Sequence, residues 1–278
     1  MAITYYMLQI PHWLFFTLIV SFGGIFAGLC ALFFRRYVNI KILKSHNEVT
    51  GFLFLAISSF YGLLLSFIVL VVWEQLNETK GNVSREGSSA MGLYYDIKFY
   101  PDTVESKQLM TLYLDFVYHV VDEEFPNMEQ LKPSIKTIES FSQVFYKMEH
   151  LNPKNQFQIQ LVAEMYNHLN QLGMYRGLRV TSMETEIPPA LWMPIILGAL
   201  VIILCNVLMD IEHLRMHIAL NIFMGMFIAM ILFIIILLDH PFAGKSGIKP
   251  KSYKEIFTME QINNGFHAST SKPNKLKK

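Results

Sequence analysis

The sequence has little charge and little cysteine, and each shortage excludes a class of protein. Charged residues make up 16% of the 278 positions, whereas a soluble globular chain averages about 25%. The two cysteines, Cys30 and Cys205, both lie inside apolar segments, which excludes a disulfide framework and gives no information on the redox compartment. The net charge is +1, so we expect no nucleic-acid partner.

The first 13 residues contain no Lys or Arg. The positively charged start of a cleaved signal peptide is therefore missing, and we expect the first apolar segment to be retained. Leu29 precedes Cys30 where a lipoprotein cleavage box needs a small residue, so lipidation of Cys30 is not expected either.

Long apolar segments are what the chain has in place of charge. Four of them occur, each of 19 residues or more with almost no charge. A helix rises 1.5 Å per residue, so each can cross a hydrocarbon core about 30 Å thick. The pattern predicts an all-α membrane protein with four transmembrane helices, arranged two and two around a polar insert. The segments are 13–34, 51–72, 191–209 and 220–238.

Composition divides the chain into four parts. Residues 1–73 hold the first two transmembrane helices, and 74–188 form a helical extramembrane insert that continues the second. Residues 189–240 hold the third and fourth helices, and 241–278 form a basic, partly disordered C-terminal tail. The insert has sixteen acidic and ten basic residues, and the stretch 239–278 has eight lysines. Because each basic charge near anionic lipid gains about 1 kcal/mol, the tail is expected to lie on the membrane or to be solvated.

Charge leaves open which side of the membrane the insert faces. Basic residues in the short loop after the first span favour a cytoplasmic loop, and the tail lysines favour a cytoplasmic tail. With four spans these two regions lie on opposite faces, so one of the two indications must be wrong. The basic residues of the loop are Arg35, Arg36, Lys41 and Lys44.

The insert is predicted to be helical because it lacks alternating strand patterns and hairpin dipeptides. No proline intervenes from Asn47 to about Tyr95, so one helix is expected to run from the second span out of the bilayer. A capping box of Asp102 and Glu105 opens an amphipathic helix, which Pro126 is expected to end.

Two further helices are expected in the insert. Residues 133–150 have apolar positions at helical spacing. The next helix is predicted to begin with Asn152 as N-cap and Pro153 at N1, and to reach about Arg179.

A histidine pair is the first candidate for chemistry. His213 and His217 lie four residues apart, so on a helix both imidazoles would share one face at metal-ligand reach. The glutamate that a zinc hydrolase places between such histidines is missing. A charged interfacial turn, with Asp210 and Glu212, is the favoured interpretation. We predict no metal and no cofactor.

The acidic run 122–124 is the second candidate. Three carboxylates in sequence at a helix end point in different directions and usually face solvent, so acid–base catalysis is not favoured. There is also no Gly-rich phosphate loop, no Ser-His-Asp arrangement and no cysteine cluster in the sequence. We therefore predict that the protein is not an enzyme.

The second span carries a stripe of small residues, Ser59, Gly62 and Ser66. Their spacing of three and four residues places them on one helix face, opposite a surface of Leu, Phe, Ile and Val. Small and hydroxylated residues in a membrane helix permit close helix packing. They also line hydrated paths whose narrow points are apolar rings. From periodicity alone, both uses remain open.

Short strings along the chain, each weak by itself, occur in a specific joint order. They are 47–52 (NEVTGF), 61–67 (YGLLLSF), 71–75 (VVWEQ), Arg85-Glu86, 124–128 (EFPNM), Arg176 and Arg179, 189–192 (PALW) and 238–244 (LDHPFAG). In this order they resemble the bestrophin-like domain family, a mostly bacterial group long catalogued as of unknown function. The chain has Phe125 where the family has Trp, and it lacks both arginines of the family's closing Leu-Asp-Arg-Pro-Phe-Arg-Gly string.

The resemblance implies remote kinship with bestrophins, which are pentameric anion channels. In bestrophins the second span of each subunit lines the pore, an apolar neck controls flow, and the helical insert is cytosolic. By this analogy 74–188 lies inside the cell, contrary to the charge of the short loop. The sequence shows neither the bestrophins' apolar neck string around a proline nor their acidic calcium-clasp run, so calcium gating is not implied.

We therefore expect a homo-oligomeric ion channel in the lipid bilayer of a bacterial inner membrane, with a homopentamer as the implied assembly. It would conduct small inorganic ions passively, with anions slightly favoured and cations a rival because the insert has a net charge of −6. The alternative is a non-conducting scaffold or sensor whose insert docks a partner. The pore-lining candidates are Asn47, Ser59, Gly62 and Ser66, and the rim candidates are Glu48, Glu74 and Glu78.

The string after the fourth span is expected to form a structural, helix-ending turn. Its residues are Asp239, Pro241, Phe242 and Gly244. We expect Asp239 to pair with a basic group such as Arg176 or Arg179.

Overall fold

The structure, a computed structural model, describes residues 9–37, 47–101, 104–130, 132, 134–183, 187–209, 211, 213–244 and 247–270. Within these residues every regular element is a helix and there is no strand. The predicted all-α fold class is thus confirmed. The predicted N-cap Asp102 lies outside the described residues.

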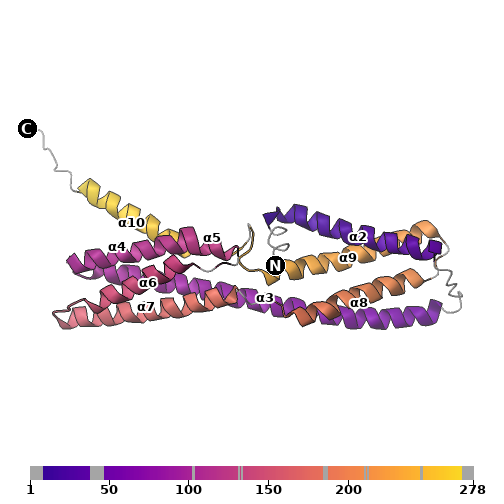
Figure 1. The fold of residues 1–278 in the computed structure, drawn as a ribbon, viewed down its shortest axis with the longest axis horizontal. Coiled ribbons are helices and arrows are strands. Elements are labelled where there is room, and N and C mark those ends of the chain that lie inside the picture. Colours follow the sequence, from indigo (N-terminus) through magenta and orange to yellow (C-terminus); the bar gives the residue numbers. More distant parts are fainter. Residues whose placement is uncertain are drawn as a thin grey trace, which may run out of the picture. The chain divides into compact units, whose positions relative to one another are not determined.

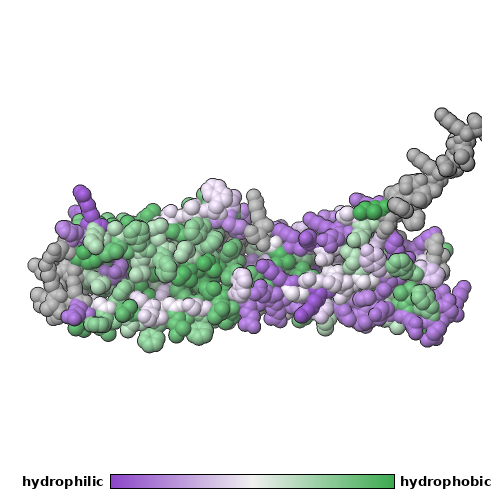
Figure 2. Space-filling view, turned by 180° about the vertical axis from the view of Figure 1, so that it is seen from behind, coloured by the Kyte–Doolittle hydropathy of each residue, from purple (hydrophilic) through white to green (hydrophobic). Residues whose placement is uncertain are grey.

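The chain forms two compact units. Unit 1 comprises Met1–Asn77 and Thr185–Lys245, and unit 2 comprises Glu78–Glu184 and Ser246–Lys278. On the face that Figure 2 shows, hydrophobic side chains cover most of unit 1, whereas hydrophilic side chains dominate unit 2. The assignment of 1–73, 74–188, 189–240 and 241–278 to membrane, insert and tail remains a prediction.

The described part of unit 1 contains four long helices, α2 (His12–Tyr37), the first part of α3 (Asn47–Phe99), α8 (Pro189–Leu208) and α9 (Leu214–Asp239) (Figure 1). All four are long and apolar enough to cross a membrane, so the prediction of four apolar helices of membrane-spanning length is confirmed. Most of their large apolar side chains are exposed rather than packed inside the chain, as expected of helices that contact lipid or other subunits.

Small residues bring α2 and α9 together. A Cβ at Gly225 would lie 2.3 Å from the Gly23 carbonyl oxygen and 2.6 Å from the Ala27 Cβ. A Cβ at Gly24 or Gly28 would lie 2.7 Å or 2.9 Å from a side chain of α9. Such close approach is what drives helix association in a membrane, where burial of apolar surface from lipid gains little.

Tyr61 joins α3 to α8. Its hydroxyl donates to the Ile195 carbonyl oxygen at 2.9 Å. Its ring lies against Gly198, where a Cβ would be only 2.4 Å from the Tyr61 Cδ2. The absent side chain at Gly198 therefore makes room for this aromatic ring.

Unit 2 contains the rest of α3, then α4 (Val104–His119), a π-helical turn η2 (Val120–Glu124), α5 (Phe125–Met128), α6 (Ile135–Glu149), α7 (Gln156–Ser182) and α10 (Lys251–Thr270). Its core is aromatic: Tyr113, Phe116 and Tyr253 are almost fully buried. The Tyr113 hydroxyl donates to the Ala90 carbonyl oxygen at 2.6 Å, which satisfies the polar end of this buried ring.

Two predicted helix limits in unit 2 require correction, whereas the long helix that continues the second span is confirmed as α3 through Phe99. Pro126 does not end the helix that precedes it: helical structure continues through η2 into α5, where Pro126 occupies the first turn. The turn before the proline is π-helical, with the Phe125 N–H donating to the Val120 carbonyl oxygen, so the missing N–H of Pro126 falls where regular α-helical bonding is already interrupted.

The start of α7 is the other correction. Asn155, rather than Asn152, is the N-cap, and its side-chain oxygen accepts from the Gln158 N–H at 2.9 Å. The Gln158 side chain in turn accepts from the Lys154 N–H at 2.6 Å. This reciprocal bonding satisfies two backbone donors at the start of the helix, which Asn152 and Pro153 do not achieve.

Candidate functional site

The stripe of Ser59, Gly62 and Ser66 faces away from its own subunit. All three residues are exposed, and a Cβ at Gly62 would meet no other atom within 4 Å. The opposite face of α3 is buried against the rest of unit 1 through Tyr61, Leu65, Ile68 and Val72. In the single chain the stripe thus forms an open, weakly polar surface.

Both serines of the stripe bond to their own helix. Ser59 Oγ donates to the Leu55 carbonyl oxygen and Ser66 Oγ to the Gly62 carbonyl oxygen, each at 2.8 Å. Each hydroxyl donor is thereby satisfied in an apolar environment, while the hydroxyl oxygen keeps acceptor capacity. The surface therefore has dipoles but no fixed charge.

Apolar residues interrupt the stripe. Leu63 and Leu70 are exposed, and at 100° per residue they project within about 40° of the Ser59 direction. A polar stripe with apolar points on the same face has the composition of a hydrated path that narrows at apolar rings.

The predicted rim residues lie at the two ends of the same helix. Glu48 is exposed and falls within about 20° of the Ser59 direction, and Glu74, also exposed, falls about 60° from it. Glu78 is exposed as the first residue of unit 2. The side chain of Asn47 lies outside what the structure describes.

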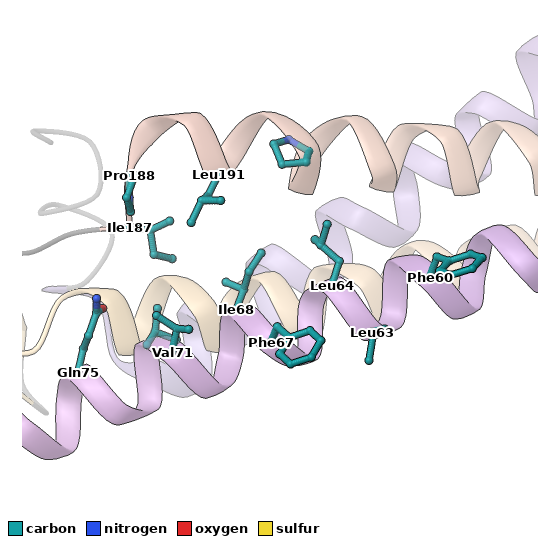
Figure 3. A pocket seen from close by; sticks show the side chains of 12 residues that line it. Phe60, Leu63, Leu64, Phe67, Ile68, Val71, Gln75, Ile187, Pro188 and Leu191 are labelled. Atoms are coloured by element: carbon teal, nitrogen blue, oxygen red, sulfur yellow. The ribbon is translucent and has the colours of Figure 1, made fainter.

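An apolar groove runs beside the stripe, between α3 and the start of α8 (Figure 3). Its volume is about 480 Å³, and Figure 3 shows α3 side chains along one wall opposite Ile187, Pro188 and Leu191. Gln75 is its single amide side chain. Nothing in this lining can act as an acid, a base or a nucleophile.

The turn after α9 holds the start of α8. Asp239, 5% exposed, accepts from the Ile187 N–H through Oδ1 at 2.7 Å. Gly244 has φ 70°, a left-handed conformation that glycine adopts without strain. Phe242 is buried and Pro241 is half-buried. The structural role expected for this turn remains a prediction.

The expected pairing of Asp239 with Arg176 or Arg179 is wrong. Arg179 donates from Nε to Glu86 Oε2 at 2.6 Å and from Nη2 to Glu86 Oε1 at 2.9 Å. Arg176 donates from Nε to Glu124 Oε2 at 3.1 Å. Both arginines thus have carboxylate partners within unit 2, while Asp239 serves a backbone donor in unit 1.

The Arg179 cluster is the most polar buried site in the described part of the chain. Arg179 Nη2 also donates to Glu124 Oε1 at 3.1 Å, and Nη1 lies 2.6 Å from Met128 Sδ. The guanidinium carbon lies 4.5 Å from the centroid of the Phe125 ring. Three residues of the 124–128 string therefore surround one guanidinium.

Helix α10 completes this cluster. Tyr253, 1% exposed, donates its hydroxyl to Glu86 Oε1 at 2.7 Å. Burial and the negative charge of Glu86 raise the pKa of Tyr253 well above its ordinary value. Burial by itself would lower the pKa of Arg179, but Glu86 and Glu124 outweigh it and raise that pKa.

The acidic run 122–124 is divided between two environments. Glu124 is buried in the Arg179 cluster, which corrects the expectation that all three carboxylates face solvent. Glu123 accepts from Lys136 Nζ at 2.9 Å, and this hydrogen bond lowers the pKa of Glu123. The π-helical turn that carries them supplies the extra residue that turns Glu124 inward.

The histidine pair is also separated. His217 is buried, with Nε2 3.4 Å from the Asn206 carbonyl oxygen, whereas His213 is exposed. Asp210 and Glu212 lie outside the described residues. Across the residues that are described, no group of three or more His, Cys, Asp or Glu side chains could hold a metal ion.

Comparison with known proteins places this geometry in a family. The sequence matches the bestrophin-like domain over residues 22–253. A solved structure of a bacterial bestrophin homolog from Klebsiella pneumoniae, carrying a point mutation, has a similar fold with a TM-score of 0.54. The two chains are 14% identical, and the match covers 90% of this chain and 100% of that one. No curated protein matches the chain. Because the family match spans most of its length, the chain belongs to the bestrophin-like domain family.

Proposed function

We propose that this protein is an oligomeric ion channel that conducts small ions passively. The observation that carries the proposal is the open stripe of Ser59, Gly62 and Ser66, which faces away from its own subunit on a membrane helix. One subunit of four spans has little room for a pore, whereas a ring of α3 helices can enclose one.

The pore is lined by α3 in this proposal. The serine hydroxyls and backbone dipoles interact with permeating ions, and Leu63 and Leu70 form narrow apolar points that gate by dewetting. Asn47 joins the lining residues, and Glu48, Glu74 and Glu78 form the rims. The exposed positions of these glutamates support this assignment.

Anions are the slightly favoured ions, by analogy with bestrophins. The described part of the second span contains no fixed cation to attract anions, so selectivity rests on dipoles. The insert has a net charge of −6, which favours cations if the insert lies on the ion path. The sign of the permeating ion is therefore a direct experimental question.

The channel is proposed to be a homopentamer in a bacterial inner membrane, with the insert in the cytosol. Kinship with bestrophins supports the subunit number and the orientation. The exposed apolar side chains of α2, α8 and α9 provide surface both for lipid and for neighbouring subunits.

Current across a planar bilayer, with KCl asymmetric across the membrane, tests the proposal. A reversal potential near the chloride or the potassium equilibrium value would support a channel and identify its ion. The matched variants are Ser66→Leu, on the stripe, and Leu197→Met, on the exposed face of α8. We expect the first to reduce the conductance and the second to leave it unchanged.

Absence of current from a folded oligomer would contradict the proposal that the protein is an ion channel. It would favour the alternative of a non-conducting scaffold or sensor whose insert docks a partner. In that case Ser66→Leu should change neither solute flux nor assembly.

A further inference from the structure

A second cavity lies in unit 2, between α3 and the start of α10. It measures about 180 Å³ and is lined by Lys80, Val83 and Ser84 of α3 and by residues 249–253. One water molecule occupies about 30 Å³ in the liquid, so the cavity has room for a tetrahedral oxyanion. None of the pore-lining candidates contributes to it.

The cavity is cationic. Lys80, Lys249 and Lys251 line it, together with Ser84 and Ser252, and no carboxylate belongs to the lining. Lys249 pairs with Glu129, which neutralises one of the three ammonium groups. Two lysines with unneutralised charge, Lys80 and Lys251, and two serines remain in the lining.

Backbone N–H groups add to the positive electrostatic potential of the cavity. The Lys251 N–H donates to the Lys249 carbonyl oxygen at 2.8 Å, and the Lys254 N–H donates to the Pro250 carbonyl oxygen at 3.1 Å. The first N–H groups of an α-helix otherwise lack intrahelical acceptors. The N–H groups of Ser252 and Tyr253 therefore contribute the positive end of the α10 dipole to the cavity wall.

The wall is held in place by two buried contacts. Tyr253 is anchored to Glu86 by its hydroxyl at 2.7 Å. Ser252 lies against Gly87, where a Cβ would be 2.4 Å from the Ser252 Cβ. Because these contacts fix α10 against α3, the backbone of the wall needs little reorganisation when a ligand binds.

We propose that this cavity binds a phosphate-bearing anion. Lysine ammonium groups bind phosphate oxygens as point charges, and hydroxyl and helix N-terminal N–H groups donate to the same oxygens. The phosphate belongs either to the headgroup of an anionic phospholipid or to a soluble phosphate compound. Binding at this site is independent of ion conduction, so it holds whether or not the protein is a channel.

Thermal unfolding of the full-length protein in neutral detergent tests the site. Inorganic phosphate is added in one series and phosphatidylglycerol in another, with KCl holding the ionic strength constant and phosphatidylcholine as the neutral lipid. We expect at least one of the two phosphate sources to raise the Tm in a saturable manner. Phosphate alone would identify a soluble ligand, and phosphatidylglycerol alone a lipid headgroup.

Three variants test whether the rise in Tm arises from binding at this cavity. Lys80→Gln and Lys251→Gln should each weaken apparent binding about tenfold or more, because each removes a charge-assisted hydrogen bond. Lys254→Gln is the matched control, since Lys254 is exposed on α10 and does not line the cavity. All three side chains are exposed, so the variants should remain folded.

Two outcomes would overturn the proposal. One is that neither phosphate nor phosphatidylglycerol raises the Tm beyond the KCl and phosphatidylcholine controls. The other is that Lys254→Gln weakens binding as much as Lys251→Gln does, which would indicate diffuse attraction to a basic surface.

Discussion

Arg179 and Glu86 form a two-point ion pair in the interior of unit 2, with Nε and Nη2 of the arginine on the two carboxylate oxygens. Both side chains are fully buried. Glu124 supplies a second carboxylate and Arg176 a second guanidinium, so the formal charges of the four groups balance. Buried charges are tolerated when they are paired and hydrogen-bonded in this way.

Replacement of Arg179 should therefore be strongly destabilising. Arg179→Met leaves Glu86 and Glu124 buried with less compensation, for which we expect a loss of about 3–5 kcal/mol. Chemical unfolding followed by helix circular dichroism measures it. Arg85→Met is the control on α3, next to Glu86, and because Arg85 is exposed it should change stability by less than about 0.5 kcal/mol. Equal effects of the two variants would contradict the structural role of the cluster.

Stability should fall above pH 10 because of Tyr253. Burial, and then the charge of Glu86, raise its folded-state pKa above the unfolded value of 10.0. Below pH 10 both states hold the proton and the contribution is fully present. As the pH rises towards the folded pKa, the unfolded state alone releases its proton, so stability falls by up to about 1.4 kcal/mol per pH unit.

Alkaline unfolding of Tyr253→Phe measures this contribution. The variant should be less stable at pH 7, because it loses the hydrogen bond to Glu86, yet its stability should fall less steeply above pH 10. Tyr118→Phe, at an exposed tyrosine, should keep the wild-type slope. A slope unchanged in Tyr253→Phe would contradict the prediction.

The interface between α2 and α9 should not tolerate a methyl group. In Gly225→Ala the new Cβ would collide with the Gly23 carbonyl oxygen and the Ala27 Cβ, for which we expect a loss of about 1–3 kcal/mol. In Gly177→Ala, where a Cβ meets nothing within 4 Å, the higher helix propensity of alanine should give a small gain. Thermal unfolding in detergent distinguishes them, and a stable Gly225→Ala protein would be inconsistent with this packing.

Water should reach α3 on one face only. In a background without Cys30 and Cys205, Ser59→Cys and Ser66→Cys in membranes should react with a charged, hydrophilic thiol reagent. Leu65→Cys is the control, because Leu65 is 3% exposed on the opposite face and should not react. Protection at both serine positions would argue against a pore along α3 and for the scaffold interpretation.

Asp239 should matter as an acceptor rather than as a charge. Asp239→Ala leaves the buried Ile187 N–H without its acceptor, for which we expect a loss of about 1–3 kcal/mol. Asp239→Asn keeps an oxygen at the same position and should lose less. Thermal unfolding ranks the variants, and the same loss in both would show that the charge, not the acceptor, is required.

The spans and the long α3 could be predicted from sequence because both depend on local properties. Apolar length fixes the spans, and the absence of proline from Asn47 onwards permits one 53-residue helix. The exact ends of the helices depend on side-chain contacts that apolar patterns do not specify. Asn152 and Asn155 are both suitable N-caps for α7, and the hydrogen bonds of Gln158 select Asn155.

The Arg179 cluster could not be assembled from sequence. Its glutamates lie 93 and 55 positions from Arg179, and no local pattern specifies which carboxylate an arginine meets. The available signals were three family elements, Arg85-Glu86, Arg176 with Arg179, and the 124–128 string. The glutamate, aromatic ring and thioether of that string are now explained, since all three contact the same guanidinium. The lining of the pore, in contrast, remains a prediction.

The packing of α2 against α9 has a consequence for biosynthesis. Gly23 and Gly225, which meet at this interface, are separated by 202 positions (225 − 23), so the first membrane helix emerges from the ribosome long before its partner exists. At a synthesis rate of about 5–20 residues per second, that interval is on the order of 10–40 s. During this time the glycine-lined face of α2 lacks the surface it is shaped to fit, and it is open to chaperones, to lipid and to helices of other nascent chains. Completion of the fourth span, rather than insertion of the first, is thus the event that commits unit 1 to its final arrangement.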